Sequence, residues 1–133
     1  MPVLDTMVLF GAADPEDIIH DKVKVYLNKV TPTGEFWIPS FALIEFDLVL
    51  RSKGKDPKKR MGTFLLFQKN YSEITSRCLS ITSAILYHLA RLENNYAIDH
   101  FDAGIVAQAL ALDGIVVTKD KAIRRIPEIE TVW

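Results

Sequence analysis

Residues 99–120, which read DHFDAGIVAQALALDGIVVTKD, decide the fold because a helix pattern runs directly into a strand pattern. Asp99 to Leu112 has the composition of a helix, and Gly114 is a typical residue to end one. Ile115 to Thr118 is a β-branched apolar run of the kind found in buried strands of parallel sheets. Small residues between positions 103 and 109 permit close packing of this helix on a sheet. This stretch therefore predicts a helix-then-strand unit of an α/β fold.

The N-terminal part of the chain repeats the same alternation. Val3-Leu4 and Phe36 to Ile38 are short apolar runs that suit buried strands. Between them, apolar residues recur at helical spacing from Ile18 to Val30, behind the turn signal Asp14-Pro15. We therefore expect strand, helix and strand in this order.

The middle of the chain predicts three further helices. Ser40 is the expected N-cap of the first, which ends near Gly54, and Pro57 begins the second. A strand at Cys78 to Ile81 stays an open question because four residues are too few to decide. The residues expected to face the core are Phe41, Ile44, Leu48 and Val49 in the first helix, Met61, Phe64, Leu65 and Gln68 in the second, and Ile81, Ile85, Leu89 and Leu92 in the third.

Together these elements predict a three-layer α/β/α fold with a central, mostly parallel sheet. The 133 residues suit a single domain spanning 1–133, with no linker or repeat. No apolar run reaches the roughly 18 residues that a membrane span needs, so we expect a soluble, cytoplasmic protein without membrane contact. The single cysteine, Cys78, excludes a disulfide framework and is expected to be a small core residue.

Positive charge is concentrated in one segment, although the formal net charge is only -1. Residues 51–60 hold six basic side chains against one acid, Asp56. This segment is either a solvated connection between helices or a patch that contacts phosphates. The residues proposed to contact nucleic acid are Lys58, Lys59 and Arg60, together with Arg124 and Arg125 near the C-terminus.

Two aspartates follow predicted strands. Asp5 follows Val3-Leu4, and Asp120 follows the run that ends at Lys119. Because parallel strands end at the same edge of a sheet, these carboxylates can meet there. Each can equally well cap a helix or nucleate a turn, so neither identifies a site alone.

Glu45 interrupts the apolar face formed by Phe41, Ile44 and Leu48. No lysine or arginine lies three or four residues away, so a local ion pair cannot neutralise it. A bound cation would neutralise the Glu45 carboxylate. Alternatively, the side chain extends to solvent or pairs with a distant base.

Asp99 and Asp102 open the helix of the quoted stretch. Asp99 is the expected N-cap, and an acid in the first turn is favoured by the helix dipole. Capping alone therefore accounts for both residues. Packing of the helix on the sheet would nevertheless hold Asp102 near the strand ends.

Four segments of the chain resemble, in order and spacing, the four motifs of PIN domains: residues 3–6 (VLDT), 40–45 (SFALIE), 101–109 (FDAGIVAQA) and 116–120 (VVTKD). The resemblance covers essentially the whole chain and is greatest to the stand-alone toxin nucleases of the VapC type. It implies that Asp5, Glu45, Asp102 and Asp120 form an acidic quartet, supported by Thr118 and Thr6. One departure is Met7, because such proteins often have serine or asparagine at this position.

The resemblance also implies an activity and partners. An oxygen-rich cluster of this kind favours Mg²⁺ or Mn²⁺, and the implied reaction is endonucleolytic hydrolysis of RNA. The implied partners are a small antitoxin protein and a second copy of the chain. Two alternatives stay open: a nuclease subunit of an RNA-processing assembly, and a non-catalytic RNA-binding module. Because all four positions hold carboxylates, the catalytic reading is favoured.

Overall fold

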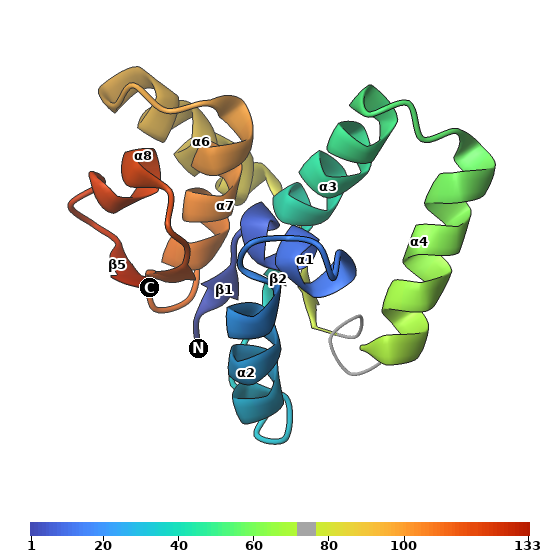
Figure 1. Cartoon of the computed structure of the whole chain (residues 1–133). Helices are drawn as coiled ribbons and strands as arrows, with labels where there is room; N and C mark the ends of the chain where they lie inside the picture. The colour runs from blue at the N-terminus through green and yellow to red at the C-terminus, as the bar shows by residue number, and fades with distance from the viewer. Residues whose placement is uncertain (72–76) are drawn as a thin grey trace.

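A parallel sheet forms the centre of the computed structural model, which describes residues 1–71 and 77–133 (Figure 1). Its strands are β1 (Val3–Leu4), β2 (Ile38–Pro39), β3 (Cys78–Leu79), β4 (Ile115–Val117) and β5 (Glu130–Val132). β1, β4 and β5 pair in that order, and β2 pairs with β3, all in parallel. Trp37 connects the two sets, because its carbonyl accepts a 2.9 Å hydrogen bond from the Leu4 amide. The combined strand order is β3-β2-β1-β4-β5.

This order reverses direction beside β1. The chain first adds β2 and β3 on one side of β1 and then returns to add β4 and β5 on the other. In open parallel sheets, ligands bind at the carboxyl ends of the strands where such a reversal occurs. Leu4 of β1 lies opposite Val117 of β4, so Asp5 and Thr118 are the first residues beyond that edge.

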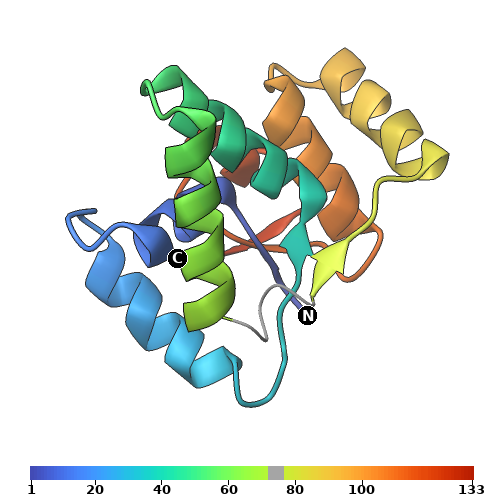
Figure 2. The same cartoon turned by 90° about the vertical axis from the view of Figure 1, so that its right-hand side faces the viewer.

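Helices cover both faces of the sheet, which confirms the predicted three-layer arrangement. α1 and α2 lie on one side of the strands, and α6 and α7 lie on the other (Figure 2). α3 and α4 form a hairpin at the edge of the molecule (Figure 1). The helices are α1 (Thr6–Ala13), α2 (His20–Val30), α3 (Ser40–Ser52), α4 (Pro57–Asn70), α6 (Ser83–Asn95), α7 (His100–Leu110) and α8 (Lys121–Arg124).

α7 is the central helix of the core, as its small residues predicted. Every residue from Asp102 to Ala109 is buried. A Cβ atom added to Gly104 would lie 2.4 Å from Cγ of Phe41, so α7 contacts α3 closely at this glycine. This contact determines how closely the helices that carry Glu45 and Asp102 approach each other.

Gln108 holds the same helices together from within the core. Its Oε1 accepts a 3.2 Å hydrogen bond from the amide of Phe41, and its Nε2 lies 2.9 Å from Oγ of Ser40 and 3.0 Å from the carbonyl of Leu79. The prediction that Ser40 caps α3 was wrong. Pro39 occupies the cap position, and Ser40 is the first helical residue, with its hydroxyl engaged by Gln108.

Several residues predicted to face the core are exposed instead. Ile44 and Leu48 on α3 are 45% and 42% exposed, and Met61 and Leu65 on α4 are 72% and 67% exposed. The residues of α3 that are buried are Phe41, Ala42, Phe46 and Leu50. α4 protrudes as one arm of a hairpin (Figure 1), so only one side of it is covered, and Phe67 is its buried residue. Cys78, predicted to lie in the core, is also exposed.

The remaining elements agree with the patterns apart from their boundaries. β3 settles the open question at Cys78, and the buried face of α6 consists of Ile85, Leu89 and Leu92, with Ile81 lying before the helix. Gly54 and Gly114 adopt positive φ angles of 79° and 74°, which suits their predicted role as helix ends. Within residues 1–71 and 77–133, no helix is long and apolar enough to cross a membrane.

Candidate metal centre

Asp5 sits at the reversal of strand order and is held by two hydrogen bonds. As N-cap of α1, its Oδ1 accepts a bond of 2.6 Å from the Thr6 amide. Its Oδ2 accepts a bond of 2.5 Å from the hydroxyl of Thr118, the residue that follows β4. Only 4% of Asp5 is exposed. The capping role proposed for Asp5 is therefore real, but it leaves the carboxylate fixed at the sheet edge.

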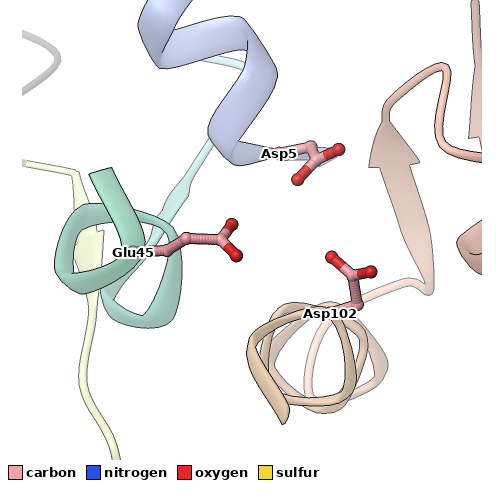
Figure 3. A group of neighbouring side chains, drawn as sticks. All are labelled: Asp5, Glu45 and Asp102. Atoms are coloured by element: carbon pink, nitrogen blue, oxygen red, sulfur yellow. The ribbon is translucent and has the colours of Figure 1, made fainter. Parts of the chain in front are cut away.

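Glu45 and Asp102 meet Asp5 from two different helices. Glu45 extends from α3 and Asp102 from the first turn of α7, and the three side chains point toward one common space (Figure 3). One carboxylate oxygen from each residue lies within 4.8 Å of those of the other two. Three carboxylates at this separation repel one another unless protons or a cation neutralise them.

The pKa values of these acids reflect that environment. Burial raises the pKa of Asp5 to about 6, opposed by its bonds to Thr118 and Thr6 and increased by the charges of Glu45 and Asp120. Burial, followed by the hydrogen bond and charge of Asp99, raises the pKa of Asp102 well above its usual range. Burial also raises the pKa of Glu45. Such elevated values are typical of a site that favours a counter-charge.

An open pocket of about 460 Å³ surrounds these carboxylates. Asp99 and Asp120 also line it, and each caps a helix: Oδ1 of Asp99 accepts from the Asp102 amide at 2.9 Å, and Oδ1 of Asp120 accepts from the Ala122 amide at 2.7 Å. Asp120 lies outside the group of three whose oxygens approach within 4.8 Å. The residues lining the pocket are Asp5, Thr6, Met7, Phe10, Glu45, Val49, Asp99, Asp102, Lys119 and Asp120.

The donor atoms of the pocket fit a hard divalent cation. The three converging groups are all carboxylates, and Mg²⁺ and Mn²⁺ prefer oxygen ligands. The hydroxyl of Thr6 is buried and has no hydrogen-bond partner within residues 1–71 and 77–133. It lies near Glu45, where it opposes the rise of that pKa without reaching hydrogen-bond geometry. A buried orphan hydroxyl beside three carboxylates suits a metal-bound water as its partner.

Met7 and Lys119 were not recognised as neighbours from the sequence. Sδ of Met7 lies 3.1 Å from the amide nitrogen of Lys119 and 3.8 Å from the Thr118 hydroxyl. The thioether thus accepts a hydrogen bond from the Lys119 amide just beyond β4, while the proton of the Thr118 hydroxyl is donated to Asp5. The position of Lys119 in the pocket could have been predicted only from its place in the sequence directly before Asp120.

The basic residues proposed to contact nucleic acid lie in two places. Lys58, Lys59 and Arg60 are on the first turn of α4, away from the lining of the carboxylate pocket. Nε of Arg60 pairs with Oδ1 of Asp47 at 3.0 Å. Arg124 ends α8, where its guanidinium donates to the main-chain oxygen of Trp133, and Arg125 is the C-cap of the same helix.

Comparison with solved structures shows that this arrangement of elements is shared. The chain superimposes with a TM-score of 0.74 and 18% identity on a structure of VapBC2 from Rickettsia felis bound to a DNA fragment from their promoter, over 98% of this chain and 96% of that chain. FitAcB from Neisseria gonorrhoeae gives a TM-score of 0.72 at 17% identity, covering 98% and 96%. A toxin-antitoxin complex from Klebsiella pneumoniae gives 0.67 at 19% identity, covering 98% and 97%.

Comparison of the sequence with curated proteins finds no match. A family model, in contrast, matches nearly the whole chain. The PIN domain model aligns with residues 3–129, which include the three converging acids Asp5, Glu45 and Asp102 and also Thr118. The fold, the strand order and this match lead to one conclusion: the chain belongs to the PIN domain family.

Proposed function

We propose that this protein is an endoribonuclease that hydrolyses RNA phosphodiester bonds with Mg²⁺ or Mn²⁺ and acts in the cytoplasm. The observation that supports the proposal most directly is the convergence of Asp5, Glu45 and Asp102 from three separate elements. Membership of the PIN domain family supports it independently, because PIN domains are generally nucleases.

The proposed chemistry assigns a task to each residue. When bound, the divalent ion would polarise the scissile phosphate and lower the pKa of a coordinated water. Asp5, Asp102 and Asp120 would hold that ion, and Glu45 would either bind it directly or orient the attacking water. Thr118 fixes the orientation of Asp5 through its 2.5 Å hydrogen bond. The hydroxyl of Thr6, which has no partner in the part of the chain that the structure describes, would form a hydrogen bond with a water of the site.

Cleavage assays test this proposal. The purified protein should cut single-stranded or loop RNA in Mg²⁺ or Mn²⁺ and stop in excess chelator at matched ionic strength. The Asp102→Asn variant, purified in parallel, controls for contaminating nucleases. Cleavage that persists in chelator, or that the variant retains at the parent's rate, would reject the metal mechanism.

We also propose that the protein is the toxin of a toxin–antitoxin pair. The structural neighbours support this, since they include VapBC2 and a toxin-antitoxin complex. An exposed apolar groove between α3 and α4 supports it further: Ile44, Leu48 and Phe64 line a pocket of about 520 Å³. The basic segment 51–60 forms the end of this hairpin, so the groove suits an antitoxin segment that is apolar and flanked by acids.

Genomic context and binding assays distinguish this reading from a subunit of an RNA-processing assembly. A short adjacent reading frame encoding a DNA-binding protein is expected, and its product should bind the parent but not the Ile44→Glu, Leu48→Glu double variant, whose two positions line the groove. Leu86→Glu on α6, where Leu86 is 48% exposed, is the control. The absence of such a frame would favour the assembly reading. Light scattering on the same samples tests the expected homodimer.

A further inference from the structure

Lys119 lies in the carboxylate pocket, and two basic side chains from other parts of the chain, Lys22 and Arg124, lie near it. Lys119 lines the pocket itself, directly before Asp120. Lys22, near the start of α2, places its Nζ 4.9 Å from the ring centroid of Trp133. Arg124 of α8 donates a hydrogen bond to the main-chain oxygen of the same tryptophan. Trp133 therefore links Lys22 and Arg124.

These positive charges lie close enough to influence one another. The pKa of Lys22 is lowered first by desolvation and then by the charge and side chain of Lys119 and the charge of Arg124. Within residues 1–71 and 77–133, neither Lys22 nor Lys119 forms an ion pair. Arg60 and Arg91, in contrast, are paired with Asp47 and Glu128. Neighbouring ammonium groups that form no close ion pair with the described residues are a favourable place for an external anion.

Two packed aromatic rings lie beneath Lys22. Tyr26 of α2 packs against Trp133 edge to face, with ring centroids 5.5 Å apart, so both aromatic rings are held beneath Lys22. The cation–π contact places the Lys22 ammonium over the Trp133 ring. Lys119 is held at its main chain by the contact between its amide and Sδ of Met7. The Lys22 ammonium thus lies over an aromatic ring, and the main chain of Lys119 is held at the end of β4.

We propose that Lys22, Lys119 and Arg124 form a subsite for an RNA phosphodiester group next to the scissile one. This inference rests on the proposed ribonuclease function. A polyanion that enters a pocket lined by Asp5, Asp102 and Asp120 is repelled until cations compensate, and this cluster supplies positive charge at the rim of that pocket. Two residues of the cluster, Lys22 and Lys119, lie outside the basic segments 51–60 and 124–125.

The test measures binding without cleavage. A fluorescent single-stranded RNA oligonucleotide is titrated with protein in excess chelator at several potassium chloride concentrations. For single strands, each lost phosphate contact lowers the salt slope by about 0.7, so the Lys22→Gln, Lys119→Gln double variant should lose about 1.4 units. Lys24→Gln with Lys29→Gln makes the same charge change on exposed positions of α2 and should leave the slope unchanged.

Each outcome is decisive. A parent-like slope in the Lys22, Lys119 double variant, an equal loss in the control, or no RNA binding by the parent would overturn the subsite. Loss of antitoxin binding with an unchanged RNA slope would assign the cluster to a protein partner and also overturn it. If the double variant shows the expected change in salt slope while the parent cuts no RNA in Mg²⁺ or Mn²⁺, the subsite stands and the proposed reaction fails. Equal melting temperatures of both double variants verify folding.

Discussion

The hydroxyl of Thr118 donates a 2.5 Å hydrogen bond to Oδ2 of Asp5 and so joins the carboxyl ends of β4 and β1. The same hydroxyl oxygen accepts from the Asp120 amide at 2.9 Å. One side chain thereby positions a carboxylate of the converging group and the start of the segment that carries Asp120. Because Thr118 is fully buried, these bonds are made without competition from water.

The pKa of Asp5 predicts how the metal-free protein responds to pH. The ordinary pKa of 3.8 rises to about 6 on folding, so the folded state binds this proton more tightly than the unfolded state does. The resulting stabilisation is complete below pH 3.8 and is lost as the pH rises through 6, on the order of 3 kcal/mol in total. In chelator, the melting temperature should therefore fall between pH 4.5 and 7, and Asp5→Asn should reduce that slope.

Metal should reverse this behaviour at pH 7. Mg²⁺ neutralises the ionised carboxylates and stabilises the parent by about 2.7 kcal/mol at a hundredfold excess over its dissociation constant. Asp5→Asn should melt at an equal or higher temperature than the parent in chelator, gain less from Mg²⁺ and lose cleavage. If Asp5→Asn instead melts clearly lower in chelator and Mg²⁺ shifts neither protein, Asp5 is a structural cap only.

Variants of Asp99 and Asp102 should distinguish a helix-capping residue from a catalytic acid. Asp102→Asn should abolish RNA cleavage. Asp99→Asn should retain it, because asparagine caps helices as well as aspartate. Removing the Asp99 charge also lowers the pKa of Asp102, so the acid limb of the pH–rate profile should move to lower pH. The reverse ranking of the two variants would assign the catalytic role to Asp99.

Much of the fold follows from local patterns. The helix and strand of residues 99–120, the strand before Asp5 and the glycine ends of α3 and α7 were predicted because periodicity and turn chemistry act over a few residues. The exposure of the apolar faces of α3 and α4 was not predicted. Helical spacing reveals that Ile44 and Leu48 share an apolar side, but which other element covers that side is decided by tertiary packing.

The candidate site divides in the same way. Glu45 could be predicted because an acid without a local basic partner interrupts an apolar helix face. Asp5 could be predicted because it follows a strand of a parallel sheet, where ligands bind. The contact of Met7 with the Lys119 main chain, and that of Lys22 with Trp133, join residues more than one hundred positions apart. No local pattern encodes such pairs, so they emerge only once the strand order brings β1, β4 and β5 together.

The contact between Gly104 and Phe41 should control both stability and metal affinity. The added Cβ of Gly104→Ala would lie 2.4 Å from Phe41, so α3 must shift, at a cost of about 1 to 3 kcal/mol. Because α3 carries Glu45, Mg²⁺ should then stabilise the variant less than the parent. Gly62→Ala in α4, with no atom within 4 Å of the new Cβ, is the control and should gain about 0.5 to 1 kcal/mol. Melts with and without Mg²⁺ check both, and a Gly104→Ala protein identical to the parent would contradict the expectation.

Asp120 offers the sharpest division between capping and chemistry, because its Oδ1 accepts from the amides of Ala122 and Ile123 at 2.7 and 3.2 Å. Asp120→Asn preserves an acceptor for that cap and removes only the charge, so the melting temperature in chelator should stay equal or rise slightly. If Asp120 completes the quartet, cleavage should fall at least about tenfold, since a lost charge interaction of about 1.4 kcal/mol already has that effect. Asp120→Ala removes the cap as well and should cost about 1 kcal/mol of stability in addition. Melting temperatures and cleavage rates of the two variants, measured in the same Mg²⁺ buffer, separate the roles: a fully active Asp120→Asn protein would leave Asp5, Glu45 and Asp102 as the complete acidic site.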